Sequence, residues 1–351
     1  MAKLLSFSAI ATKIRAMQSK LLTENDYREL AALGSVSEAV VFLKKQPAYA
    51  NLFSAVDETR LHRGQVERIL HLSLYTDFNK LYRFSNMEQR KFLNLYFMRY
   101  ENSILKTCMR SVLNGNKDIP NKDIVKDFFE HYSSIDMDKL FVAHTIEEFV
   151  ACLKGTNYYK PLSKLLDLSK PTLFDYEMTL DLFYFSNLWN LTKKLLKGDV
   201  LHSILACYGS KIDMLNIQWI YRSKKYYSLS PADIYALLIP VSYRLKKQNL
   251  MQLVESPSIE EFNIVLSTTY YAKLNAKFFS AEVSSGETLE DLYTKLLDKI
   301  YFSSGRKNPY SVACINTYLY RKGHEVERLT TALECIRYGL DTSDTLHYLI
   351  K

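Results

Sequence analysis

Residues 140–162, LFVAHTIEEFVACLKGTNYYKPL, contain six spaced residues whose pattern occurs three times in the chain. In each copy a leucine is followed by Ser or Thr, by Glu three residues later, by a second leucine and by Tyr-x-x-Leu. The copies recur about 110 residues apart, which predicts that the 351-residue chain consists of nearly three copies of one unit. The three sets are Leu30, Ser35, Glu38, Leu43, Tyr49, Leu52; Leu140, Thr145, Glu148, Leu153, Tyr159, Leu162; and Leu253, Ser258, Glu261, Leu266, Tyr271, Leu274, the last with one residue fewer before its tyrosine.

The pattern predicts a capped helix. Ser or Thr followed three residues later by Glu is a capping box, in which the hydroxyl accepts from a free N–H of the first turn and the Glu reaches back to the N–H of the cap residue. Behind the cap, Phe149, Cys152 and Leu153 follow the spacing of one helix face. We interpret the repeated glutamates, tyrosines and leucines as cap and core positions and not as a ligand site.

A second pattern, Tyr-x4-acid-x3-Leu or Ile, also repeats at about 110 residues and is followed each time by an Asp near the start of an apolar run. Such an Asp is favoured at a helix start, and Pro120 and Pro231 stand at two of these entrances. The members are Tyr96, Glu101, Leu105 with Asp123; Tyr208, Asp213, Ile217 with Asp233; and Tyr320, Glu325, Leu329 with Asp344.

One unit therefore contains a helix with the Tyr-x4-acid pattern, a helix with an early Asp, the capped helix and a long return helix. We predict an all-α protein of three quasi-equivalent helical subdomains in a funnel-like pseudo-threefold arrangement. The predicted units are 1–95, 96–207 and 208–319, with 320–351 as a partial repeat that completes the first unit. The expected first helix is about 9–22, and long helices are expected along 67–81, 176–195 and 289–302.

Composition excludes several classes of protein. Hydrophobic content of 48% with 10 Gly and 8 Pro is typical of a folded chain. The formal net charge is +8, and basic and acidic residues are interspersed along the chain. This small basic excess favours an acidic protein partner, lipid headgroups or nucleic acid, but it does not select among them. The five cysteines show no C-x-x-C and are expected to be reduced core thiols of a cytosolic protein. No apolar run is long enough to span a bilayer. The N-terminal residues are expected to form an amphipathic helix that stays in the mature chain and is not a cleaved signal peptide.

The sequence contains none of the common catalytic, nucleotide-binding or metal-binding motifs, so we assign no catalytic, cofactor-binding or metal-ligating residue. There is no phosphate-binding glycine loop, G-x-S-x-G or H-E-x-x-H, and no Cys/His group has zinc spacing. His144 is interpreted as a helix-entrance residue, and Asp136 with Asp138 as a solvated turn. The pairs Glu147-Glu148 and Glu260-Glu261 belong to the capped helices and repeat, which points to structure and not to acid–base catalysis.

The stretch 221–227, YRSKKYY, is the best candidate for nucleic-acid binding because it mixes three cations with tyrosines. It is also typical of an exposed helix end, and we do not predict a nucleic-acid partner.

The whole chain resembles the C subunit of bacterial and archaeal V-type (A-type) rotary ATPases, which corresponds to the d subunit of the eukaryotic V-ATPase. The resemblance is carried by residues 7–30, FSAIATKIRAMQSKLLTENDYREL, by the capped helices ending in Tyr-x-x-Leu, by residues 96–110 and by residues 318–340. The copies differ around Asn102 and Asn216, so no contact residue is transferred from the family.

The resemblance implies a funnel of three subdomains on the cytoplasmic face of the membrane, attached through the rotor ring and not by insertion. Such a protein would be a non-catalytic part of the central stalk that seats the shaft of the D and F subunits and couples it to transport of H⁺ or Na⁺, or to ATP synthesis. The alternatives are a general helical scaffold and an enzyme with an unrecognised helical active site.

Overall fold

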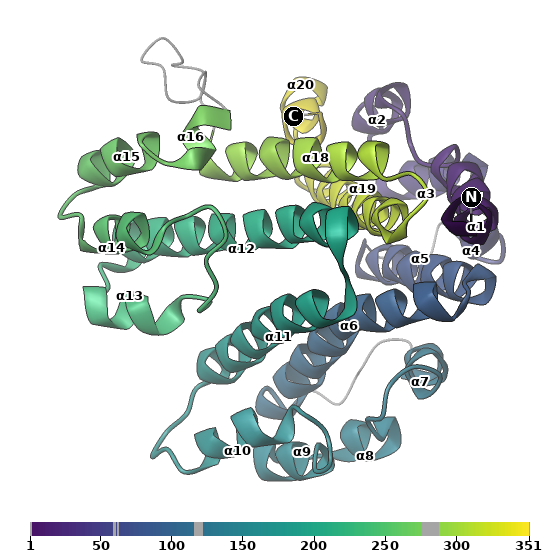
Figure 1. Ribbon diagram of the computed structural model, residues 1–351. Helices are drawn as coiled ribbons and strands as arrows, with labels where there is room; N and C mark the ends of the chain where they lie inside the picture. The colour runs from purple at the N-terminus through teal and green to yellow at the C-terminus, as the bar shows by residue number, and fades with distance from the viewer. Residues whose placement is uncertain (1, 59–60, 62, 116–121, 275–287, 351) are drawn as a thin grey trace. The chain divides into compact units, whose positions relative to one another are not determined.

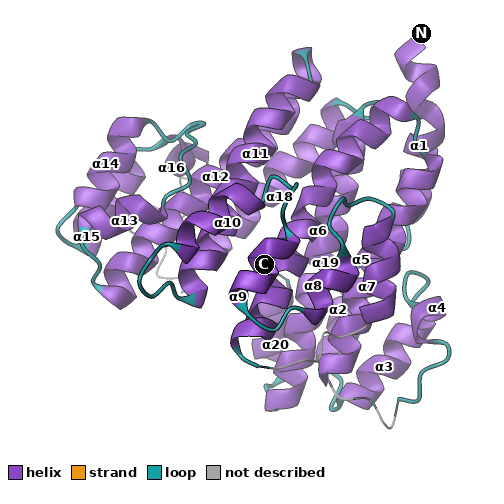
Figure 2. Ribbon diagram, turned by 90° about the horizontal axis from the view of Figure 1, so that it is seen from below, coloured by secondary structure: helices purple, strands orange, loops and turns teal. Residues whose placement is uncertain are grey.

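The computed structural model describes residues 2–58, 61, 63–115, 122–274 and 288–350, and every regular element in these ranges is a helix (Figures 1 and 2). The all-α prediction is confirmed. Pro120, expected at a helix entrance, lies outside the described residues. All five cysteines are free thiols.

The described helices fall into two compact units, residues 1–90 with 301–351 and residues 91–300. Their bounds, in chain order, are α1 (Ala2–Gln18), α2 (Glu24–Ala31), α3 (Val36–Lys45), α4 (Ala50–Phe53), α5 (Arg63–Phe84), α6 (Met87–Leu113), α7 (Lys122–Glu130), α8 (Met137–Val142), α9 (Ile146–Cys152), α10 (Tyr159–Leu166), α11 (Leu173–Leu195), α12 (Gly198–Tyr227), α13 (Pro231–Leu237), α14 (Lys247–Glu255), α15 (Ile259–Ser267), α16 (Tyr270–Leu274), α18 (Leu289–Lys307), α19 (Val312–Tyr338) and α20 (Thr342–Leu349).

The first unit joins the two ends of the chain around one core. Helix α19 packs against α5, α1, α3 and α2, and the last helix, α20, packs against both α19 and α2. Tyr27 and Phe42 from the N-terminal region share this core with Val326, Leu333 and Leu349, all of them buried. The apolar faces of α2 and α3 are therefore covered by residues that lie about 300 positions later in the sequence.

The second unit begins within α6, which makes polar contacts with α11 and aromatic contacts with α7. Asn102 and Lys106 both donate to the carboxylate of Asp181, over 2.7 and 2.9 Å. On the same helix, Phe97 packs against the rings of Phe128 and Phe129 of α7. The bonds to Asp181 hold the long return helix α11 alongside α6 within this unit.

Helix α12 organises the rest of the second unit, where it packs against α11, α13, α14 and α15. Its apolar face meets Leu253, Phe262 and Leu292 in one buried core. The side chain of Asn216 donates to the Ile239 carbonyl and accepts from the Ile239 N–H, over 3.1 and 2.9 Å. The amide thus satisfies both backbone groups of a buried residue just after α13.

The three repeated caps form as predicted, but their glutamates bond differently. The hydroxyls of Ser35, Thr145 and Ser258 each accept from the N–H three residues later. Glu38 and Glu148, however, accept from the residue before the cap, Gly34 and His144, over 2.8 Å in both cases. The reciprocal capping box was therefore the wrong prediction for these two copies. It occurs instead at residue pairs that lead α2, α11 and α18, namely Thr23 with Asp26, Thr172 with Asp175 and Thr288 with Asp291.

The first helix differs from its predicted bounds of about 9–22, because α1 spans Ala2–Gln18. Leu21 and Leu22 have helical spacing with the residues before them but lie outside the helix. The Leu22 N–H instead donates to Glu325, over 2.6 Å, and Thr23 caps the next helix. A tertiary hydrogen bond and a local cap together override the periodic pattern at this point.

Thr172→Ala should lower the free energy of unfolding by about 0.5–2 kcal/mol, because it removes the capping box of α11. Denaturant unfolding followed by circular dichroism measures this change. Asn190→Ala, an exposed change on the same helix, is the control and should stay within about 0.5 kcal/mol of the parent. Equal effects of the two substitutions would show that the cap contributes nothing particular.

Candidate functional site

The acidic residues of the Tyr-x4-acid pattern lie on the three longest described helices, α6, α12 and α19. Each accepts a hydrogen bond from a tyrosine that is either the tyrosine of the capped-helix pattern or its immediate neighbour. The two sequence patterns therefore meet in space, although each was recognised separately. We call these pairs the tyrosine–carboxylate centres. With their oxygen–oxygen distances they are Tyr158 with Glu101 (2.9 Å), Tyr271 with Asp213 (2.6 Å) and Tyr49 with Glu325 (2.6 Å).

Each carboxylate also accepts hydrogen bonds from a third part of the chain. This part lies one helix before the capped helix and leads into that preceding helix, so every centre joins three segments. The donors, with their distances, are the Ser133 hydroxyl to Glu101 (2.6 Å); the N–H groups of Tyr243 (3.1 Å), Arg244 (2.6 Å) and Leu245 (2.8 Å) to Asp213; and the Leu22 N–H to Glu325 (2.6 Å). These segments lead into α8, α14 and α2. The same three-way connection thus occurs twice in the second unit and once in the first.

The tyrosine of the second copy is Tyr158, whereas the sequence pattern assigned Tyr159. Tyr158 is buried and bonds to Glu101, while Tyr159 is only partly buried and begins α10. The sequence has two adjacent tyrosines here, so the pattern could be aligned on either one. Alignment on Tyr159 preserved the Tyr-x-x-Leu spacing to Leu162. With Tyr158 in place, the second and third copies have the same spacing between the leucine and the tyrosine.

Asp213 accepts from backbone because a glycine lets the chain approach its helix. The ring of Tyr243 lies against Gly209, one turn before Asp213, and a Cβ at position 209 would overlap that ring. The segment 243–245 can therefore turn three successive N–H groups toward the carboxylate, whose residue is only 1% exposed. The sequence patterns did not predict this contact between the 243–245 backbone and Asp213, and Gly209 is the one residue that could have indicated it.

Burial shifts the pKa of two of the carboxyls and of all three phenols in the centres. It raises the pKa of the Glu101 and Asp213 carboxyls above their ordinary values, and the hydrogen bonds that they accept oppose the rise. It also raises the pKa of the phenols of Tyr49, Tyr158 and Tyr271, to which the neighbouring carboxylate adds. The phenols therefore keep their protons and act as donors at neutral pH.

The centre at Glu325 contains a cation that the other two lack. Lys322 is 1% exposed, and its ammonium lies 3.0 Å from the Glu325 carboxylate and 2.6 Å from the Tyr49 hydroxyl. The Tyr49 hydroxyl accepts from the lysine while it donates to the carboxylate. The positions equivalent to Lys322 hold Met98 and Ser210, so the buried ion pair occurs at one centre of the three.

The residues that the sequence offered as possible metal-binding or acid–base groups have structural partners close to them in the chain. Asp136 caps α8 and pairs with Lys139 over 2.8 Å, which lowers the pKa of its carboxyl, and Asp138 pairs with Lys126 over 2.6 Å. His144 donates its backbone N–H to Glu148, and this bond lowers the pKa of that carboxyl. Among the described residues, the partners of these three carboxylates are lysines or a backbone N–H and not a second carboxylate.

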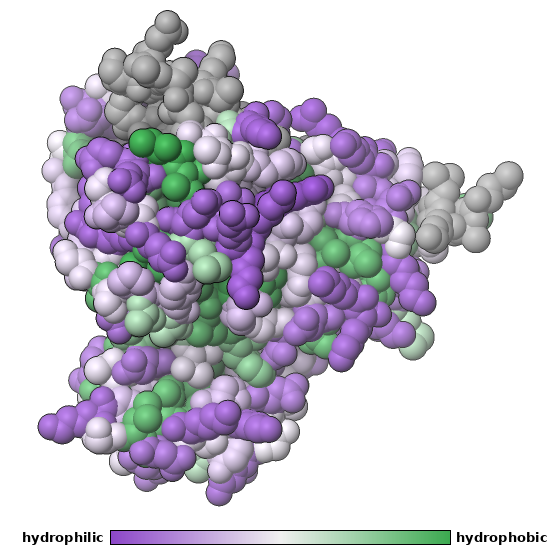
Figure 3. Space-filling view, turned by 60° about the vertical axis from the view of Figure 1, so that its left-hand side comes forward, coloured by the Kyte–Doolittle hydropathy of each residue, from purple (hydrophilic) through white to green (hydrophobic). Residues whose placement is uncertain are grey.

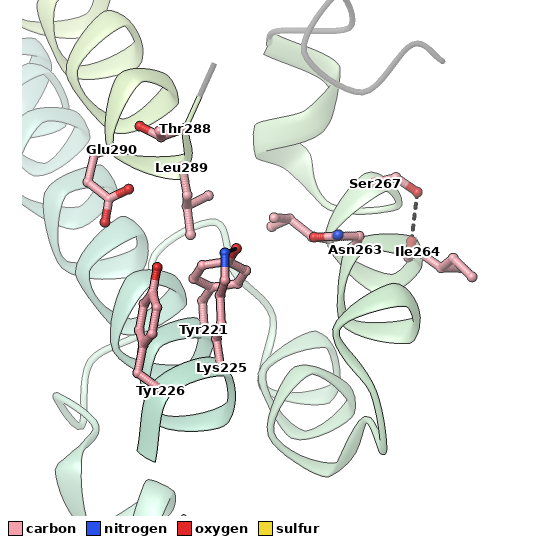
Figure 4. A pocket seen from close by; sticks show the side chains of 10 residues that line it. Tyr221, Lys225, Tyr226, Asn263, Ile264, Ser267, Thr288, Leu289 and Glu290 are labelled. Carbon is pink, nitrogen blue, oxygen red and sulfur yellow. Dashed lines mark hydrogen bonds between the residues drawn. The ribbon is translucent and has the colours of Figure 1, made fainter. Parts of the chain in front are cut away.

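The stretch 221–227 forms the exposed end of α12 and lines an open groove of about 570 Å³ with residues of α15 and the start of α18 (Figure 4). Its three cations make contacts within the unit. Arg222 pairs with Glu290 over 3.0 Å, Lys224 donates to the Ser256 carbonyl over 2.7 Å, and Lys225 donates to the Tyr221 hydroxyl over 2.8 Å. Each of the three cations therefore has a partner within the unit, and they do not form a separate basic strip.

On the face seen in Figure 3, hydrophilic residues dominate and hydrophobic ones gather in separate patches. Among the residues that the structure describes, no group of three His, Cys, Asp or Glu is placed to hold a metal ion. Within those same residues, no helix combines the length and the apolar character needed to cross a bilayer.

Comparison with known proteins decides the family. The profile of the ATP synthase (C/AC39) subunit matches residues 10–348. The chain is 27% identical to the C subunit of the A-type ATP synthase of Methanosarcina mazei, covering 92% of this chain and 87% of that protein. For the subunits of the same name from Methanosphaera stadtmanae and Methanosarcina acetivorans, identity is 25% and 26%, covering 90% and 97% of this chain and 80% and 91% of the relatives.

The chain belongs to the ATP synthase (C/AC39) subunit family.

This assignment confirms the family resemblance and the prediction that the chain is not an enzyme, because the family is not that of the catalytic subunits. The C/AC39 subunit is thus part of a membrane-associated ATPase complex. In such a subunit we interpret the tyrosine–carboxylate centres as structural joints between segments of the chain.

Tyr271→Phe should destabilise this subunit by about 1–3 kcal/mol, because it removes one donor from a buried carboxylate and keeps the ring. Chemical denaturation measures the loss. Tyr270→Phe, at the exposed neighbouring ring, is the matched control and should have little effect. The centre would have no energetic role if both variants unfolded at the parental midpoint.

Glu101→Gln should cost less stability near pH 7 than near pH 4. Both side-chain partners of Glu101 are hydroxyls, which can reverse their hydrogen bonds toward an amide. Because the native pKa of Glu101 is raised, the stability that its carboxyl adds is complete below the ordinary value of 4.5 and declines as pH rises through the native pKa. Unfolding free energies of variant and parent across this pH range test the sign. A gap that widens toward pH 7 contradicts it.

Lys322→Met should destabilise the subunit by about 3–5 kcal/mol, because it leaves Glu325 buried without its cation. The double variant Lys322→Met/Glu325→Gln removes both charges and should recover part of this loss. Additive effects of the two single substitutions would show that the ion pair is not coupled.

Proposed function

We propose that this C/AC39 subunit is the non-catalytic adapter of the central rotor in a V-type (A-type) rotary ATPase. It joins the shaft of the D and F subunits to the rotor ring of the membrane, so that ATP-driven rotation moves H⁺ or Na⁺ and reverse rotation supports ATP synthesis. In this proposal the protein lies on the cytoplasmic face as a peripheral protein and is held there by the ring.

The family match over residues 10–348 carries the proposal, because it extends over nearly the whole chain and relates it to the C subunits of A-type ATP synthases. The repeated architecture supports a mechanical role. Three successive copies of a helical unit, 1–95, 96–207 and 208–319, with 320–351 completing the first, could surround an axial shaft in a funnel-like pseudo-threefold arrangement.

The tyrosine–carboxylate centres suit a part that transmits torque. Each centre connects a long helix to two other segments by short hydrogen bonds, so a force on a peripheral helix reaches the long helix through bonded groups. Close-packed interiors have low compressibility and transmit strain. The longest helix, α12, has 30 residues and spans about 45 Å at 1.5 Å per residue.

Reconstitution tests the function directly. Membrane vesicles carrying the ATPase without this subunit should hydrolyse ATP but accumulate no ions, and addition of the purified protein should restore ATP-driven ion uptake together with retention of D and F on the membrane. Addition of an unrelated helical protein is the control. Full ion uptake without this subunit, or a purified protein that binds neither D–F nor the ring, would refute the adapter role and leave a general scaffold.

The net charge of +8 leads to a prediction about the joint. If basic residues of this protein meet acidic surface on the shaft or ring, affinity should fall several-fold when ionic strength rises from about 0.1 M to about 1 M, as the screening length drops from about 10 Å to about 3 Å. Calorimetry of the protein with D–F in this range measures the effect. An affinity that does not respond to salt would mean that apolar contacts hold the joint.

A further inference from the structure

A pocket of about 370 Å³ in the first unit is lined by three arginines from three helices. Arg15 comes from α1, Arg306 from the last turn of α18 and Arg321 from α19 (helices labelled in Figure 1). Apolar walls, including Ile14 and Phe302, complete the pocket. We call it the arginine pocket.

The arginine pocket has no carboxylate among its lining residues. The sequence explains this: residues 1–23 and 302–324, which contain every lining residue, include no Asp or Glu. The Cys314 thiol in the wall stays neutral, since burial raises its pKa to about 11. The Thr317 hydroxyl donates to the Tyr301 carbonyl over 2.8 Å. The pocket is therefore positive without an internal counter-ion.

The guanidinium groups have hydrogen-bonding capacity left over. The side chains of Arg15 and Arg306 make no hydrogen bond or ion pair with any other residue that the structure describes. Arg321 lies over the Phe302 ring, 5.3 Å from its centroid, a contact that leaves the edge of the guanidinium available. Elsewhere in the chain, Arg63 and Arg222 are paired with glutamates.

Local structure explains how three like charges gather here. Arg15 and Arg306 occupy the last turns of their helices, where the helix dipole favours a cation. Gly305 packs directly against Thr317, so α18 and α19 approach closely and bring Arg306 and Arg321 to one pocket. The dipoles account for two of the arginines, but Arg321 lies in the interior of α19, where no helix end favours it.

We propose that the arginine pocket binds a phosphate group. Guanidinium forks match the oxygens of phosphate in geometry, and a multiply charged oxyanion offsets three cations better than a single carboxylate does. The volume accommodates a diphosphate, and the apolar wall suits the organic part of a phosphate ester. The phosphate comes either from a soluble compound or from a lipid headgroup. This proposal does not depend on the rotor function.

Inorganic pyrophosphate is the probe for the soluble source. Titration of the full chain by calorimetry, with sodium chloride adjusted to constant ionic strength, should give saturable binding. For the lipid source, flotation compares vesicles of phosphatidylcholine with vesicles that also contain phosphatidylglycerol. Binding of either probe that depends on the arginines supports the proposal and identifies the source.

The variants Arg15→Gln and Arg306→Gln change exposed side chains, and each should weaken binding about tenfold. Lys307→Gln is the matched control, because Lys307 is an exposed cation beside Arg306 that does not line the pocket, and its effect should stay below about twofold. Thermal unfolding checks that each variant folds. No binding of either probe, or binding that persists in the double arginine variant, overturns the proposal.

Discussion

A buried carboxylate in the middle of a long helix is the constraint on which each repeat of this protein depends. Such a group is costly inside a protein unless donors surround it, because it loses its hydration on folding. At Asp213 and Glu325 the acidic residue is no more than 4% exposed, and hydrogen bonds from two separate segments replace the lost water. The helix, the tyrosine segment and the preceding segment must therefore come together for any of them to be stable.

The three centres satisfy this constraint with different donors. Glu101 uses a serine hydroxyl, Asp213 three backbone N–H groups, and Glu325 one backbone N–H and a buried lysine. The tyrosine hydroxyl is the donor common to all three. The acid and the tyrosine thus keep their positions in every copy, while the residues that complete the centre vary with the local path of the chain.

The first unit shows what the repeat means for the ends of the chain. Its acid, Glu325, lies on α19 near the C-terminus, whereas its tyrosine and backbone donor, Tyr49 and Leu22, lie near the N-terminus. The ends are consequently joined by a buried polar centre as well as by an apolar core. These two sets of contacts hold the N-terminal and C-terminal segments together as one compact unit. Such a unit suits a member of the C/AC39 family that is proposed to carry mechanical load.

The sequence by itself determined the helical class, the three-fold repetition of the patterns and the caps at Ser35, Thr145 and Ser258, because these depend on local spacing and on side chains a few residues apart. It also carried the resemblance to the family. Only the tertiary structure decided that Tyr158, and not Tyr159, meets Glu101, that α1 ends at Gln18, and that three arginines share one pocket. Those outcomes depend on hydrogen bonds and packing between residues far apart in the chain, to which local periodicity is insensitive.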